Sequence, residues 1–188
     1  ADKELGKAIE ISLEDERFRD TLILVLGCKL GLRVSEMTNL KWRDLDLEER
    51  WLKITAGKGK KQRYVPIPEM VKNLFIDYRS WWEETRESLS DQILLNQRGK
   101  PITTRGIRSI LENISQKYCD HQKLYPHLLR HHYATKLLKN DIDIRTIQEL
   151  LGHKNISTTQ IYTHLDFGKL QKQVNQLHSL GSKAKTKD

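Results

Sequence analysis

The sequence is poor in the residues that build disulfide frameworks and many metal sites. It has two cysteines among 188 residues, Cys28 and Cys119, and they are far apart in the chain. This number and spacing favour neither a disulfide framework nor a zinc knuckle. Cys28 lies in an apolar stretch, which is typical of a small core residue. We therefore expect a cytoplasmic protein, and the cysteines themselves indicate no metal site and no cofactor.

Long hydrophobic runs are also missing. The longest, Leu22 to Leu26, is far shorter than the roughly 20 residues that a membrane-spanning helix needs. The first residues, ADKELGKAIE, contain no apolar stretch like that of a signal peptide. We expect no membrane partner.

Acidic residues are outnumbered by basic ones. The chain has 33 Lys and Arg against 25 Asp and Glu, a formal net charge of +8, and its pI is about 9.4. A solvated basic surface would explain the excess. A polyanion would also explain it, because Lys and Arg that neutralise phosphates release counterions. Charge alone leaves nucleic acid as one of two interpretations.

Hydrophobic periodicity predicts a mainly α-helical domain with a small antiparallel β-sheet, an α+β fold. The expected helices cover the start of the chain to 16, 18–26, a turn starting at Ser35, 69–86, 104–118, 127–139, 144–151, a short one opened by Ser157, and 168–180. Strands 51–55 and 63–67 should pair as a hairpin, and Ile93–Leu95 is a candidate third strand. Pro126 suits a helix start and Gly152 a helix end.

Four separate segments carry residues suited to phosphate chemistry. They are Gly31-Leu32-Arg33-Val34-Ser35-Glu36, Gly57-Lys58-Gly59-Lys60, His127-Leu128-Leu129-Arg130-His131, and Leu150-Leu151-Gly152-His153 with Tyr162 nine residues later. The hairpin region 53–64 carries five basic residues and no acidic one. Its turn lacks the spacing and hydroxyl of a nucleotide-binding phosphate loop.

Each segment alone has an ordinary explanation. Arg33 could be a surface arginine paired with Glu36. His127 and Arg130 share one helix face and could serve in capping or ion pairing. His153 could be an ordinary neighbour of a C-cap glycine, and Tyr162 a core or surface tyrosine.

Taken in order, these segments resemble the tyrosine recombinase or phage integrase family, in an Xer-like form. The segments HLLRHHYAT (127–135) and LLGHKNISTTQIY (150–162) carry the most specific part of the resemblance, which covers about residues 15–180. The fold implied is the DNA breaking-rejoining catalytic domain. The activity implied is cleavage and rejoining of double-stranded DNA through a 3′-phosphotyrosine, without metal or ATP.

The resemblance also implies roles for individual residues. Arg33 and Arg130 would clamp the scissile phosphate, and Lys58 would protonate the leaving 5′ oxygen. His127 would pair with the second arginine, and His153 stands at a histidine or tryptophan position of the family. The remaining assignments are Tyr162 as nucleophile, Glu36 as support for the first arginine, and Lys60, Lys61 and Arg63 as DNA-binding residues.

The family further implies a domain organisation and an assembly. We expect residues 1–180 to form the catalytic domain, 181–188 a disordered tail, and the N-terminal core-binding domain of the relatives to be absent from this chain. The apolar stripe Leu170, Val174, Leu177 and Leu180 could pack on its own domain or dock into a neighbour in a tetramer on DNA. A flexible segment, Thr163 to Lys169, would permit that exchange. Without DNA we expect a monomer or weak oligomer.

Three alternatives remain open. A metal-dependent hydrolase could use His127, His131, His132 and His153, but the glutamate of H-E-x-x-H is missing between the first two. A DNA-binding module without catalysis would fit the same basic surface. A type IB topoisomerase-like relaxase would share the chemistry and differ in the reaction's outcome.

Overall fold

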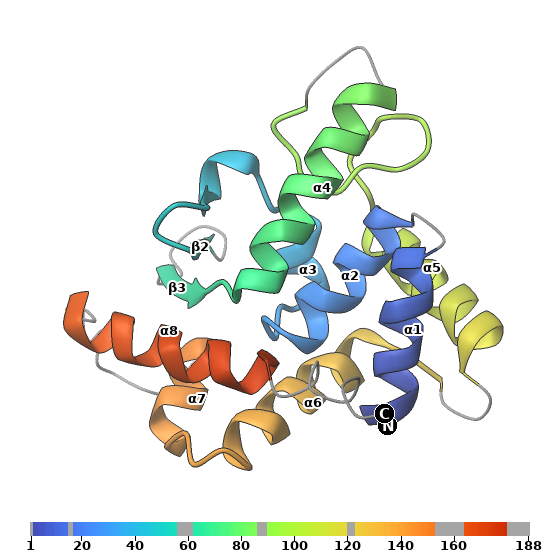
Figure 1. Ribbon diagram of the computed structural model, residues 1–188. Coiled ribbons are helices and arrows are strands. Elements are labelled where there is room, and N and C mark those ends of the chain that lie inside the picture. The colour runs from blue at the N-terminus through green and yellow to red at the C-terminus, as the bar shows by residue number, and fades with distance from the viewer. Residues whose placement is uncertain are drawn as a thin grey trace, which may run out of the picture.

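The protein is represented by a computed structural model that describes residues 2–14, 17–55, 62–85, 90–119, 123–152 and 164–179. Figure 1 shows helices packed around α2, with a small sheet at one side. The elements are α1 (Asp2–Glu14), α2 (Phe18–Cys28), α3 (Val34–Met37), η1 (Trp42–Asp44), β1 (Leu45–Asp46), β2 (Trp51–Thr55), β3 (Gln62–Pro66), α4 (Glu69–Thr85), α5 (Thr104–Tyr118), α6 (Pro126–Leu138), α7 (Ile144–Leu151) and α8 (His164–Ser179). The predicted α+β class is confirmed.

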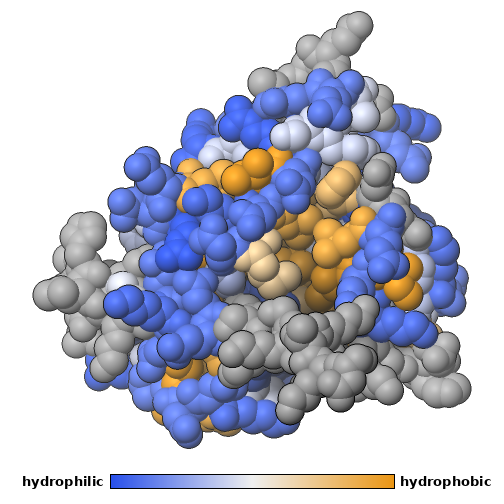
Figure 2. Space-filling model, viewed as in Figure 1, coloured by the Kyte–Doolittle hydropathy of each residue, from blue (hydrophilic) through white to orange (hydrophobic). Residues whose placement is uncertain are grey.

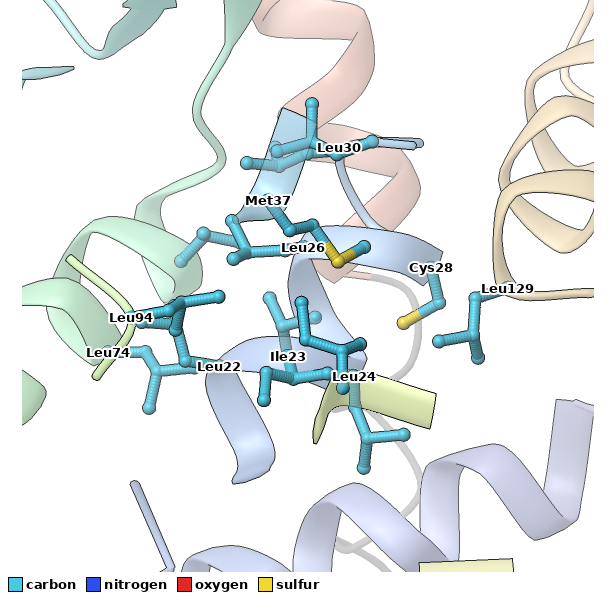
Figure 3. Packing of buried hydrophobic residues seen from close by; sticks show 14 of the residues in the cluster. Leu22, Ile23, Leu24, Leu26, Cys28, Leu30, Met37, Leu74, Leu94 and Leu129 are labelled. Carbon is cyan, nitrogen blue, oxygen red and sulfur yellow. The ribbon is translucent and has the colours of Figure 1, made fainter. Parts of the chain in front are cut away.

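Helix α2 forms the centre of the main core. All its residues from Asp20 to Cys28 are buried, and it contacts α1, α4, α5 and α6. Figure 3 shows Leu129 of α6 beside Cys28, and Leu74 and Leu94 near Leu22. A helix apolar on all sides is expected in such a central position.

The sheet is antiparallel, with strand order β1-β2-β3. The predicted hairpin is confirmed, and its register pairs Leu52 with Val65 and Ile54 with Arg63. Leu52, Ile54 and Val65 are buried. Because side chains alternate across a strand, Arg63 has its side chain on the same face as these three core residues.

The prediction of a third strand at Ile93–Leu95 is wrong. The third strand is β1, and residues near 92–101 form isolated bridges, Lys41 with Gln92 and Leu95 with Pro101. The apolar run is buried, as a strand would be. Its backbone pairs, however, with Leu40 on one side and Ile102 on the other, and neither contact extends into a ladder.

Most helix boundaries agree with their sequence signals. Thr103 is the N-cap of α5, and its side chain accepts a bond from the Gly106 N–H. Pro126 occupies the first turn of α6, and Gly152 ends α7 in the left-handed conformation. The turn expected to start at Ser35 begins at Val34, with Arg33 as its N-cap.

A second hydrophobic cluster joins α6, α7 and α8. Its members are Tyr133, Leu137, Ile142, Ile147, Leu150, Leu151, Leu170, Val174 and Leu177. Figure 1 draws α8 across the α7 side of the molecule, next to β3. Helix α8 begins at His164, so the expected flexible connector up to Lys169 is wrong from residue 164 onward. Gly168 lowers helix propensity by about 1 kcal/mol without ending a helix.

The visible surface is mostly polar. Figure 2 shows hydrophilic residues over most of one face, with hydrophobic ones gathered in its middle, over the region of α2. Among the residues described, no helix is long and apolar enough to span a membrane.

Candidate active site

The start of α3 holds Arg33 and Glu36 together. The Arg33 N–H donates to Glu36 Oε2 at 2.8 Å, and its Nη1 donates to Oε1 at 3.1 Å. The carboxylate therefore caps the first turn and anchors the arginine side chain, which stays 39% exposed. The ion pair between Arg33 and Glu36 that the sequence analysis considered is present. It leaves much of the Arg33 guanidinium open to solvent.

Arg63 reaches the same carboxylate from β3. Its Nη1 donates to Glu36 Oε1 at 2.7 Å and its Nη2 to Oε2 at 2.8 Å. Parallel bonds of this kind are strong and fix the relative orientation of the two groups. Both side chains are largely buried, at 12% and 6% exposed.

Glu36 is ionised in this environment. Burial alone would raise the pKa of its carboxyl group, but hydrogen bonds and charge from Arg63, with further bonds from Arg33, lower it below the ordinary value of 4.5. The buried carboxylate therefore keeps its charge at neutral pH and holds two arginines.

The C-terminal end of α7 is the second anchor. Arg63 Nε donates to the Leu150 carbonyl at 2.7 Å. Arg33 donates through Nη1 to Leu151 O and through Nη2 to Gly152 O, both at 3.1 Å. Unpaired carbonyls at a helix C-terminus carry partial negative charge, which favours cations there.

Arg130 joins this cluster from α6. Its Nη1 donates to Gly31 O at 2.7 Å, and its Nη2 donates to Leu151 O, the carbonyl that Arg33 also uses. Burial, with the positive charges of Arg33 and Arg63, lowers the pKa of Arg130 to about 10. The residue is still a cation at neutral pH, in a place where positive charge is crowded.

Two glycines allow this close approach. Gly31 has φ +64°, and a Cβ there would lie 2.4 Å from Cδ1 of Tyr133. Gly152 has φ +65°, and its Cβ would lie 2.9 Å from Nη1 of Arg63. Residues with a side chain would be strained in the backbone and crowded at both positions.

His127 lies on the first turn of α6 and is exposed, one turn before Arg130. Within the described ranges, no three His, Cys, Asp or Glu side chains are grouped to hold a metal ion.

Five predicted site residues lie outside the described residues: Lys58, Lys60, Lys61, His153 and Tyr162. The structure thus brings together Arg33, Glu36, Arg63 and Arg130, and places His127 on the same helix as Arg130. Sequence reasoning missed the contribution of main-chain carbonyls at 150–152. It also treated Arg63 as a surface residue, although strand alternation with Val65 would have put it on the core face.

The protein-family comparison matches residues 2–169 to the model described as the phage integrase family. The chain belongs to the phage integrase family. Among curated relatives, it is 40% identical over 177 residues to the tyrosine recombinase XerC of Pediococcus pentosaceus, covering 90% of this chain and 58% of that protein. It is 42% identical over 169 residues to XerC of Listeria innocua, covering 87% and 56%. The chain therefore spans somewhat more than half the length of these integrase-family relatives.

Solved structures agree with this membership. A crystal structure of XerA recombinase matches with a TM-score of 0.76 and 33% identity, covering 94% of this chain and 63% of that one. XerH site-specific recombinase bound to difH substrate matches with a TM-score of 0.68 and 26% identity, covering 98% and 52%. The fold is that of a tyrosine recombinase catalytic domain, as the sequence predicted.

Proposed function

We propose that residues 1–180 form the catalytic domain of a site-specific DNA recombinase, which cleaves and rejoins DNA through a covalent 3′-phosphotyrosine on Tyr162. The observation that carries the proposal is the meeting of Arg33 and Arg130 at one carbonyl, that of Leu151. Residues 97 positions apart in sequence thereby place their guanidiniums side by side. An anion bound between them would offset the two largest causes of the lowered pKa of Arg130, which are its burial and the repulsion from Arg33.

A phosphodiester suits this cluster because its non-bridging oxygens are negative and gain charge as a fifth oxygen approaches. Two planar guanidiniums can each hold such oxygens in fixed geometry. Removing one preorganised donor to a developing charge costs roughly 10²–10³ in rate. Glu36 contributes indirectly, by fixing Arg33.

In the proposed reaction, Oη of Tyr162 attacks phosphorus while the bond from phosphorus to the 5′ oxygen breaks. The tyrosine proton passes to His127, and Lys58 gives a proton to the leaving 5′ oxygen. His153 adds a further hydrogen bond to the phosphate. Because the phosphotyrosine retains a phosphoester bond, a 5′-hydroxyl from another DNA end can attack it and restore the backbone without ATP.

Double-stranded DNA is the proposed partner. The net charge of +8 favours a polyanion. Arg98, Lys100, Arg105 and Arg108 are exposed in and before the first half of α5. One structural relative, XerH, was solved bound to its difH substrate. Lys60, Lys61 and Arg63 are the DNA-binding residues proposed from the sequence, and the buried position of Arg63 suggests another role for it.

We further propose a homotetramer on DNA, joined through the helix at 170–180. In the structure Leu170, Val174 and Leu177 are buried within their own chain. Polar bonds of α8 in the structure run from the Gln171 side-chain amide to the carbonyls of Glu49 and Arg50, and from the Glu69 N–H to Asn175 Oδ1. An identical helix from a neighbour could make the same contacts, which keeps the cost of exchange low.

The proposal is tested by incubating the chain with a labelled pool of nicked duplexes that have a randomised central segment. We expect a covalent adduct that survives denaturation, is absent in Tyr162→Phe, and forms equally in EDTA. Absence of any adduct with the unmodified chain would favour a DNA-binding module. Loss of the adduct in EDTA would favour a metal-dependent hydrolase.

A second assay separates recombination from relaxation. The duplex sequence recovered from the adducts is placed in supercoiled plasmids. We expect strand exchange between two copies of that site. Relaxation of plasmids that lack the site, without exchange, would instead identify a type IB topoisomerase-like enzyme.

A further inference from the structure

Arg63 uses all three nitrogens of its side chain inside the protein. The two Nη atoms bind the oxygens of Glu36, and Nε binds the carbonyl of Leu150. The side chain is 12% exposed. An arginine that contacts DNA phosphates needs an exposed guanidinium, whereas that of Arg63 is largely buried and has three of its five N–H groups bound inside the protein.

The bonds of Arg63 connect three separate segments of the site. The residue itself belongs to β3, Glu36 to α3, and Leu150 to the end of α7. Its guanidinium also packs over Gly152, where a Cβ would lie 2.9 Å from Nη1 and 3.2 Å from Cζ. Arg63 therefore touches the residue directly before His153 and the carboxylate that anchors Arg33.

Arg63 also determines how Glu36 is shared. It binds the two carboxylate oxygens at 2.7 and 2.8 Å, whereas the Arg33 side chain binds one of them at 3.1 Å. Without Arg63, Arg33 would be the remaining side-chain partner of the Glu36 carboxylate among the described residues. Glu36 would then be held by one side-chain bond at 3.1 Å, and Arg33 would lose the firmly held carboxylate that directs its guanidinium at a phosphate.

We propose that Arg63 is a positioning residue for the cleavage reaction: it saturates Glu36 and fixes the end of α7, so that Arg33 and Arg130 keep their guanidiniums directed at one phosphate. The inference rests on the proposed function, and it replaces a DNA contact with an internal role.

The test compares Arg63→Met, Arg63→Lys and Glu36→Gln with the unmodified chain, using a duplex recovered from the randomised pool. Single-turnover cleavage is measured with protein in excess, and DNA affinity is measured over a range of salt concentrations. Arg79→Met is the matched control, because Arg79 forms an exposed ion pair with Glu83 on α4. Circular dichroism and urea unfolding identify conditions under which every variant is folded, and cleavage is compared under those conditions.

We expect Arg63→Met to slow cleavage by the folded protein roughly 10–100-fold, the size of effect seen when a residue that orients the ligands of a metal site is replaced. Arg63→Lys should recover part of the rate, because it restores the charge without the paired bonds. Salt dependence of DNA affinity should be unchanged in both. The control Arg79→Met should cleave at the normal rate.

The pH profile separates positioning from a purely structural role. In Arg63→Met, Glu36 loses the strongest interactions that lower its pKa, so it becomes protonated at higher pH than before. Cleavage by this variant should therefore rise with pH over the mildly acidic range. The double variant with Glu36→Gln should lose that rise and cleave no more slowly than the more impaired single variant.

Two results would overturn the inference while leaving the proposed function intact. One is normal cleavage by Arg63→Met. The other is weaker DNA binding by Arg63→Met with a salt slope reduced by about one phosphate contact. If the unmodified chain forms no adduct, the proposed function itself fails, which is a separate outcome.

Discussion

Single residues decide the electrostatics of this site, and Glu36 is the clearest case. One buried carboxylate lies among three arginines, bound directly by Arg33 and Arg63 and acting through its charge on Arg130. Removing one member of a buried ion pair leaves the other uncompensated, which typically costs about 3–5 kcal/mol. The group that never touches DNA in our account therefore determines whether the groups that do are held in place.

Glu36→Gln should change how stability depends on pH. Because the folded pKa of Glu36 lies below 4.5, its ionised form stabilises the fold above that value, and this stabilisation is lost as pH falls through the folded pKa. Urea unfolding as a function of pH should show a shallower loss below pH 4.5 in the variant.

Asp143 is a necessary control for that experiment, because hydrogen bonds from Thr146 also lower its pKa. Asp143→Asn should flatten the same acidic range without affecting DNA cleavage. Identical acid profiles for Glu36→Gln and the unmodified chain would contradict the ionised state of Glu36.

Tyr133 is a position where removal of a polar group should not destabilise the fold. Its ring is fully buried under Gly31, and its hydroxyl has no hydrogen-bond partner among the residues that the structure describes. A buried hydroxyl without a partner costs about 1–3 kcal/mol of desolvation. Tyr133→Phe should therefore leave the free energy of unfolding unchanged or raise it by about 1 kcal/mol, as measured in urea. A loss of stability would show that the hydroxyl has a partner.

At the scale of elements, the end of α7 organises the site. Its last carbonyls receive bonds from Arg63, Arg33 and Arg130, and the left-handed Gly152 makes room for them. A helix terminus that would otherwise need a cap is satisfied by the arginines of the site.

Gly152→Ala should destabilise the protein by more than the ~1–2 kcal/mol of a left-handed alanine, because the new Cβ also meets Arg63. Gly99→Ala is the matched control: Gly99 has φ +73°, and a Cβ there meets nothing within 4 Å. Urea unfolding should give a larger loss for Gly152→Ala, and cleavage should fall in that variant alone. Equal losses for the two would contradict the contact.

Periodicity was sufficient to predict most elements. Helices α2, α4, α5, α6 and α7 and the hairpin of β2 and β3 agree with the sequence patterns. The wrong strand prediction concerns which segments pair with each other. An apolar run such as Ile93–Leu95 has the composition of a strand, but the segments on either side of it decide whether a ladder forms. The helix that begins at His164 runs through Gly168, within the segment that the sequence predicts to be flexible.

The site was predicted in part. The family resemblance carried by the four ordered segments indicated Arg33 and Arg130, the arginines that the fold brings together. Bonds from side chains to the carbonyls at 150–152 leave no trace in the pattern of side chains, so spacing could not reveal them. Strand alternation could have predicted the buried position of Arg63. The prediction instead grouped Arg63 with its basic neighbours as a DNA-binding residue.

At the scale of the whole molecule, the arginine cluster lies where two hydrophobic clusters meet. Helix α6 belongs to both, through Leu129 on the main core and Tyr133 on the second cluster. Arg130 lies between these two residues in sequence. Bonds from Arg33 and Arg63 to α7 cross the same boundary. The packing of the two hydrophobic clusters against each other therefore determines the relative positions of Arg33, Arg63 and Arg130.

The state of α8 gives a prediction at this scale. Because its apolar residues are buried within their own chain, we expect light scattering to find a monomer or weak oligomer without DNA. With duplexes recovered from the randomised pool, a tetramer should form, and a chain that ends at Thr163 should lose it. A well-defined tetramer of the free protein would contradict this account.

The most direct test of the central claim replaces the phosphate at the cleavage point by a methylphosphonate, which lacks one negative oxygen. If Arg130 serves to neutralise that phosphate, Arg130→Ala should slow cleavage of the ordinary linkage roughly 10²–10³-fold and have little effect on the neutral linkage. An equal loss on both linkages, in variants shown to be folded, would mean that the arginine cluster does not act on the phosphate that Tyr162 attacks.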